Sequence, residues 1–281
     1  MWVEKYWDTS IEQWTLPEII FDVNVPLTVE QKELVVNTIS SYIENYKLAW
    51  LYTERSIHIT AFTQKEDIND LSLAQTSWTT IALNTLVWYE SRSHVQIANI
   101  IRHEMWHTIP TIRNNAISFL LTTWDKILAT EWFRFVVLPS GVETEKFLYV
   151  IEEAFCDLLA FDQALAVGEL YDVVNYVNYA NQLLLMNLCK ERNMSLQTLI
   201  DLYRASDIYW FTSSILGCTN PDVYDIEFVL NCFTWLAMSA SWLISDAEKK
   251  SSTNPWLLDM LPTNIGILAD RKKNEILNYQ K

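Results

Sequence analysis

The sequence predicts an α+β protein that is mainly helical, in which a small N-terminal sheet is followed by a helical C-terminal lobe. Residues 56–63 alternate between apolar and polar side chains, and residues 79–89 are rich in β-branched side chains, as is typical of strands. After Tyr89 the apolar residues recur at helical spacing through about residue 280. We expect a soft boundary near Gly168, between a core over residues 1–168 and a helical lobe over 169–281.

The first helix is expected just after Pro26. Thr28 and Gln31 fit a capping box, in which each side chain satisfies the backbone N–H of the other residue. The apolar side chains that follow at helical spacing are Val35, Ile39, Tyr42, Ile43 and Tyr46. The helix is predicted to end near Lys47. Residues 48–52 are a further candidate strand, so at least two strands are expected before Tyr89.

Longer helices are predicted farther along the chain. Ser93 and Gln96 form a second capping box, and Pro110 is expected to stop the helix that begins there. An amphipathic stretch over Glu143–Val167 predicts another helix. The uncharged run Phe228–Ser245 reaches the lower limit for a membrane span, but it contains polar residues and lacks flanking cations. We therefore expect a buried helix there and no membrane span.

Composition excludes several classes of partner. A net charge of −15 would repel the phosphate backbone, so no nucleic-acid partner is expected. The N-terminus has no apolar run behind basic residues, and without a secretory signal the expected location is cytoplasmic. The four cysteines include no Cys-x-x-Cys pair, which argues against a disulfide framework and against a thiolate zinc site.

His103, Glu104 and His107 form a His-Glu-x-x-His motif inside the helix that begins near Ser93. Residues four apart share a face of a helix, so the two imidazoles can bind one ion while Glu104 lies beside them. Paired imidazoles suit zinc. The flanking residues are uncharged, which is typical of a motif helix that packs its other side in a core.

A catalytic zinc site needs a third protein ligand and one position open to water. Both remaining histidines precede the motif, and Arg113 stands six residues after His107, where the metzincin pattern requires histidine. The next predicted helix offers Glu152, Glu153 and Asp157. Glu153 and Asp157 are four apart and therefore share a face, while Glu152 competes for the ligand role.

A His-Glu-x-x-His helix followed by a Glu-x-x-x-Asp helix resembles the gluzincins, among which thermolysin-like peptidases are familiar. The resemblance covers roughly residues 79–165. It implies a zincin-like catalytic core over 1–168, a Zn²⁺ cofactor, and a peptide or protein substrate. It also implies that residues 79–89 form the sheet edge along the cleft, where a peptide could pair as an added strand.

Carried onto this chain, the resemblance implies that His103, His107 and Glu153 bind zinc. Glu104 would be the general base that accepts a proton from the attacking water, as metal-assisted hydrolysis also requires. Asp157, one helical turn beyond Glu153, would orient a histidine ligand through its other ring nitrogen.

Glu152 and Glu153 are about 100° apart on a helical wheel. Glu153 has small or apolar neighbours three or four residues away, together with Asp157, which suits a partly buried ligand. Glu152 lies on an edge that we expect to face water. We therefore predict that Glu153 is the ligand and that Glu152→Ala costs little zinc affinity.

These patterns favour a zinc-dependent hydrolase, most specifically a metallopeptidase. One alternative is a regulatory protease resembling the short phage and mobile-element proteases that cleave repressors. Another is a non-catalytic helical interaction protein whose metal site is structural or vestigial. The histidines could also be ordinary surface residues, and the acids of the second helix a solvated face. The cleaved bond, the oxyanion donor and the oligomeric state stay open.

Overall fold

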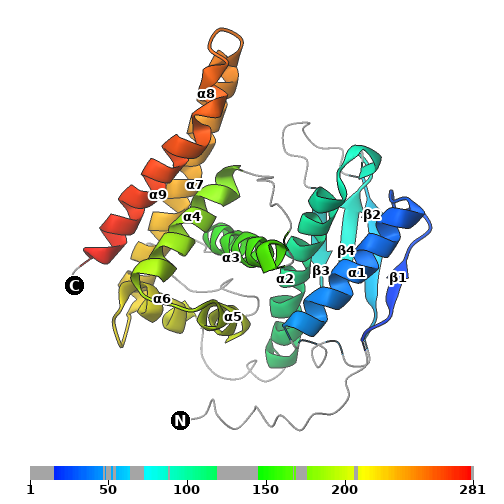
Figure 1. Cartoon of the computed structure of the whole chain (residues 1–281). Helices are drawn as coiled ribbons and strands as arrows, with labels where there is room; N and C mark the ends of the chain where they lie inside the picture. The colour runs from blue at the N-terminus through cyan, green and yellow to red at the C-terminus, as the bar shows by residue number, and fades with distance from the viewer. Residues whose placement is uncertain are drawn as a thin grey trace.

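The structure, a computed structural model, describes residues 16–46, 48, 52, 55–63, 73–87, 89–118, 145–166, 168, 176–205 and 208–279. The chain is mainly helical and has a small mixed sheet, which confirms the predicted α+β class (Figure 1).

Four described strands form the sheet in the order β1-β2-β4-β3. They are β1 (Ile19–Phe21), β2 (Ile57–Phe62), β3 (Ala74–Ser77) and β4 (Thr80–Asn84). β1, β2 and β4 are parallel, whereas β3 runs antiparallel to β4. β2 and β4 confirm two predicted strands. The expectation that residues 79–89 form the sheet edge is wrong, because β4 pairs with β2 on one side and with β3 on the other.

Helix α1 (Val29–Asn45) begins at the predicted capping box. The Gln31 N–H donates to Thr28 Oγ1 at 3.2 Å, and the Thr28 N–H donates to Gln31 Oε1 at 3.0 Å. The helix lies across the sheet (Figure 1) and buries its apolar stripe in the core. Of the strand expected over 48–52, only residues 48 and 52 are described, and neither lies in a strand.

Helix α2 (His94–Ser118) follows a short 3₁₀ turn (Tyr89–Ser91) and lies along β3. Its predicted capping box is present, with Ser93 and Gln96 exchanging two hydrogen bonds of 3.2 Å. The expectation that Pro110 stops the helix is wrong. Proline has no N–H to donate to the carbonyl of Trp106, four residues earlier. The buried Tyr203 hydroxyl donates to that carbonyl instead, at 2.9 Å.

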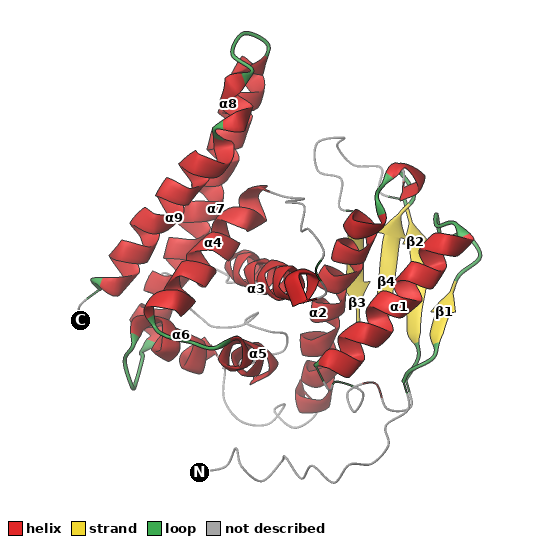
Figure 2. Cartoon of the chain, viewed as in Figure 1, coloured by secondary structure: helices red, strands yellow, loops and turns green. Residues whose placement is uncertain are grey.

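The remaining helices form the C-terminal part of the chain. They are α3 (Glu145–Ala166), α4 (Tyr176–Glu191), α5 (Leu196–Ala205), α6 (Ile208–Leu216), α7 (Val223–Ser251), α8 (Trp256–Asp259) and α9 (Leu261–Leu277). α3 lies between α2 and α4 and packs against both, while α7 and α9 form a long hairpin with α8 at its far end (Figure 2).

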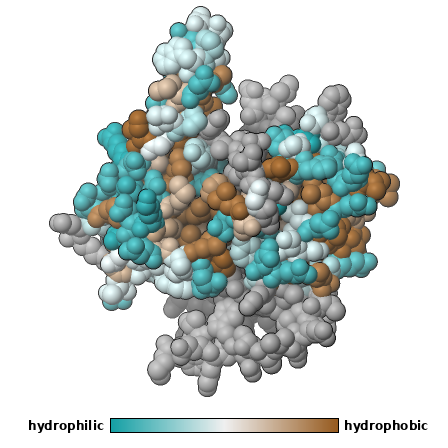
Figure 3. Space-filling view, in the orientation of Figure 1, coloured by the Kyte–Doolittle hydropathy of each residue, from teal (hydrophilic) through white to brown (hydrophobic). Residues whose placement is uncertain are grey.

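The uncharged run Phe228–Ser245 is helical as predicted, within α7. Among the described residues, α7 is the helix whose length and hydropathy would allow it to cross a membrane, and 39% of its most apolar window is buried. One face packs in the core while Trp235, Met238 and Trp242 are exposed, so the expectation of a buried helix holds for one face only. On the face shown in Figure 3, hydrophilic side chains cover much of α1 and α9.

Candidate metal centre

Three side chains from α2 and α3 converge on one point. His103 and His107 come from α2, one helical turn apart, and Glu153 comes from α3. The two Nε2 atoms are 3.1 Å apart. His103 Nε2 is 3.2 Å from Glu153 Oε2, and His107 Nε2 is 3.3 Å from Glu153 Oε1. The structure thus brings together the three ligands that the sequence predicts, and Glu153 faces the histidines.

The spacing of these atoms fits a zinc ion. Zinc–nitrogen and zinc–oxygen bonds of about 2.0–2.1 Å in a tetrahedral site place neighbouring ligand atoms about 3.3 Å apart. The two Nε2 atoms are 3.1 Å apart, and each lies 3.2–3.3 Å from a different oxygen of the Glu153 carboxylate. A set of two imidazoles and one carboxylate is also the donor chemistry of catalytic zinc sites, in which a fourth position is left for water or substrate.

Each imidazole is held through its other ring nitrogen. His103 Nδ1 lies 2.7 Å from Asp157 Oδ1, as predicted for the orienting carboxylate. His107 Nδ1 lies 2.9 Å from Glu152 Oε1. The expectation that Glu152 faces water is wrong, since its side chain is only 12% exposed and contacts His107. Such contacts fix the tautomer and the ring orientation, so that each Nε2 points toward the other imidazole and Glu153.

The charges of the cluster are strongly coupled. Burial lowers the pKa of His103, but Asp157 and Glu153 outweigh it and hold that pKa well above 6.5. Burial also lowers the pKa of His107, while the Cys156 thiol and Glu153 outweigh it and keep that pKa well above 6.5. Burial raises the pKa of Glu153, but the two imidazoles bring it well below 4.5. The cluster therefore attracts positive charge, and a metal ion would displace protons from the imidazoles.

Asn178 of α4 is a member of the cluster that sequence reasoning missed. Its Nδ2 donates to Glu153 Oε2 at 2.9 Å. Because α4 packs along α3, a third helix contributes a hydrogen bond to this carboxylate. No sequence signal singles out this asparagine, which lies in a different helix from every other residue of the cluster.

Glu104 lies beside the cluster and does not join it. Its carboxylate Oε2 accepts a hydrogen bond from Thr76 Oγ1 at 2.6 Å, and the same hydroxyl lies 3.2 Å from the Glu104 carbonyl. The Glu104 side chain is buried. Thr76 is in β3, so this hydrogen bond joins the edge strand directly to helix α2.

The opposite side of the motif helix is packed as predicted. Met105, Trp106 and Thr108 are fully buried. The Trp106 ring makes edge contacts with the rings of Tyr42, at 5.0 Å, and Tyr203, at 5.9 Å. These contacts keep the α2 backbone fixed against α1 and α5, so His103 and His107 on its other face are held in place.

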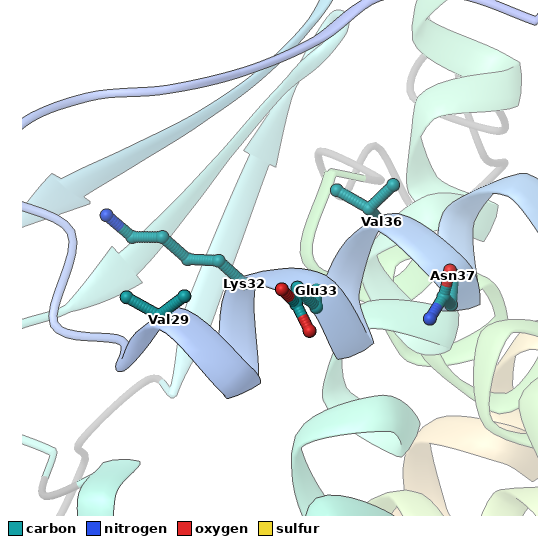
Figure 4. A pocket seen from close by; sticks show the side chains of 5 residues that line it. All are labelled: Val29, Lys32, Glu33, Val36 and Asn37. Atoms are coloured by element: carbon teal, nitrogen blue, oxygen red, sulfur yellow. The ribbon is translucent and has the colours of Figure 1, made fainter.

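An open hollow of about 460 Å³ lies elsewhere, on the outer face of α1 (Figure 4). It is lined by Val29, Lys32, Glu33, Val36 and Asn37. All five belong to a single helix, and none takes part in the His–Glu cluster.

Comparisons with known proteins add no further constraint. No family model matches the chain, and no curated protein or solved structure matches it either. The side chains described above are therefore the basis for any assignment of function.

Proposed function

We propose that this protein is a zinc-dependent hydrolase, most specifically a metallopeptidase. The observation that carries the proposal is the convergence of His103 Nε2, His107 Nε2 and the Glu153 carboxylate at distances of 3.1–3.3 Å. Both imidazoles are fixed by carboxylates through Nδ1, which is how histidine ligands of zinc are usually oriented. A zinc ion bound there would polarise a carbonyl group and lower the pKa of water toward neutrality.

Glu104 is the general base in this proposal. The Thr76 hydroxyl donates a hydrogen bond to Glu104 Oε2. Among the described residues, Glu104 Oε1 accepts no hydrogen bond. Oε1 is therefore the oxygen that takes a proton as water adds to the peptide carbonyl. The same carboxyl group then delivers that proton to the leaving amine, so the base is restored when the C–N bond breaks.

Edge strand β3 is the proposed platform for the substrate. It is the last strand in the order of the described sheet, and its residues Gln75 and Ser77 are exposed. An extended peptide would pair with β3 through main-chain hydrogen bonds, as in other cases of strand addition. The contact between Thr76 and Glu104 would bring the paired peptide past the general base.

The environment of Glu104 favours this function over a structural metal site in a helical interaction protein. A structural site needs ligands but no additional carboxylate, and burying an ionised carboxylate is costly unless it is hydrogen-bonded. Glu104 is buried, hydrogen-bonded and outside the ligand set. No described contact favours the alternative of a repressor-cleaving protease over a peptidase with other substrates.

The deciding experiment compares the zinc-loaded protein with Glu104→Gln on a mixed peptide library, with products read by mass spectrometry. The variant should keep its zinc and lose at least about 100-fold in turnover, because the amide cannot take the proton. Glu33→Gln, an exposed position on α1, is the matched control and should change neither property. Near-wild-type turnover by Glu104→Gln, or a zinc-loaded wild type that cleaves nothing, would refute the proposal.

A further inference from the structure

The turn between β3 and β4 contains a strained tryptophan. Ser77 pairs with Thr80, so Trp78 and Thr79 form a two-residue hairpin loop. Trp78 has φ = 59°, whereas Thr79 is not among the described residues with positive φ. Positive φ at the first loop residue alone is the pattern of a type II′ turn, where glycine is the usual residue. For a bulky side chain this backbone region is unfavourable.

The protein itself covers only part of the Trp78 indole. The Trp78 side chain is 48% exposed, so about half of its large apolar surface stays in water. The other described non-glycine residue with positive φ is Asn193, a residue type that tolerates the region. Glycine at position 78 would relieve the strain without emptying any core. Residues held in such a backbone conformation cluster at sites of binding or catalysis.

Trp78 lies close along the chain to the residue that holds Glu104. It follows Thr76 by two residues, and the Thr76 hydroxyl holds the Glu104 carboxylate. Two residues of extended chain span at most about 7 Å. An indole reaches nearly as far again from its Cα, so Trp78 can contact a peptide that lies along β3. The residues around it on this strand and turn, Gln75, Ser77 and Thr79, carry no charge.

We propose that Trp78 is a specificity-determining residue whose indole contacts a large apolar side chain of the substrate. The substrate class is thus a peptide that pairs with β3 and carries an aliphatic or aromatic residue next to the scissile bond. This inference rests on the proposed peptidase function. It explains why tryptophan occupies a glycine position in the turn: the contact with substrate outweighs the strain.

Two measurements test the inference: the stability and activity of Trp78 variants, and the affinity of these variants for altered peptides. Trp78→Gly, Trp78→Phe and the control Trp242→Ala, which removes a 70% exposed tryptophan of α7, are made in the full chain. Trp78→Gly should keep its zinc and stay folded, with a change in Tm of only a few degrees, because the relief of backbone strain and the lost burial of half the indole oppose each other. On the best cleaved library peptide, it should lower kcat/KM at least about tenfold. Trp78→Phe should recover most of that loss, and Trp242→Ala should show none.

The second measurement is an alanine scan of that peptide, read as affinity for the zinc-loaded Glu104→Gln protein by calorimetry. One apolar position should lose about tenfold or more in affinity with Trp78 present and much less in the Trp78→Gly background. Equal losses in both backgrounds would overturn the inference while the peptidase function stands. A scan whose coupled position is cationic or acidic would overturn the substrate class. If the wild type neither cleaves nor binds any peptide, the proposed function and this inference both fall.

Discussion

Each imidazole of the candidate metal centre depends on a carboxylate of α3 for its orientation. Glu152 contacts His107 and Asp157 contacts His103, so the two acids are expected to matter about equally. Glu152→Ala and Asp157→Ala should each weaken zinc binding by about 10–100-fold. The measurement is a competition titration against a fluorescent zinc chelator.

Asp162→Ala is the control for that titration, since Asp162 lies on the same helix and takes no part in the cluster. Its zinc affinity should equal that of the wild type. An unchanged affinity in Glu152→Ala would show that the contact with His107 has no role in binding.

Local spacing explains why some residues of the site could be predicted from the sequence. His103, Glu104 and His107 share one stretch of helix, and Glu153 and Asp157 share another, so helical periodicity alone places each set on one face. Periodicity does not say how the two helices are rotated against each other. That rotation decides whether the Glu152 side chain faces water or contacts His107. The burial of Glu152 could therefore not be predicted.

At the scale of elements, α2 continues through Pro110 because another helix supplies the missing donor. We expect Tyr203→Phe to destabilise the protein by about 1–3 kcal/mol, because the buried Trp106 carbonyl loses its hydrogen bond. The free energy of unfolding, from urea titration, measures this. Tyr224→Phe, at a 64% exposed position of α7, should cost almost nothing.

A double-mutant cycle identifies the cause of that loss. In a Pro110→Ala background the backbone N–H of residue 110 can bond the Trp106 carbonyl again. Tyr203→Phe should then cost clearly less than it does in the wild type. Equal costs in both backgrounds would mean that the hydroxyl acts elsewhere, for example through its contact with Cys156 at 3.3 Å.

The starts of two helices could be predicted from the sequence, whereas two short strands could not. α1 and α2 begin at their predicted capping boxes, because a cap is a local arrangement of four residues. β1 and β3 have three and four residues, and β3 reads Ala-Gln-Thr-Ser, without an apolar alternation. β1 pairs with β2, which is distant in sequence, and β3 is held by its pairing with β4, so neither strand could be recognised from its own residues.

For the whole molecule, buried thiols predict a loss of stability in alkali. Burial raises the pKa of Cys189 and of Cys232 from 9.0 to about 12. The folded state therefore keeps these protons after the unfolded chain has lost them. The stabilisation is complete below about pH 9 and declines toward pH 12, by at most about 1.4 kcal/mol per pH unit for each thiol.

Urea titrations between pH 7 and pH 11 test this decline. The double variant Cys189→Ala, Cys232→Ala should show a shallower fall in the free energy of unfolding than the wild type. Identical slopes would mean that other groups cause the alkaline loss.

The partial exposure of α7 could not be predicted, because a run without charges reads the same whether one face or all faces are buried. The arrangement of the other helices around it decides this. Packing of α4 and α9 against α7 covers one stripe and leaves Trp235, Met238 and Trp242 exposed.

The central claim is that His103, His107 and Glu153 bind one zinc ion. The most direct measurement is the zinc content per chain, by mass spectrometry, after incubation with equimolar zinc and extensive dialysis. Wild type and the control His94→Ala, an exposed histidine at the start of α2, should each retain about one zinc, because three ligands fix the ion. His107→Ala and Glu153→Ala should retain almost none. A wild type without zinc, or stoichiometric zinc in His107→Ala, would contradict the claim.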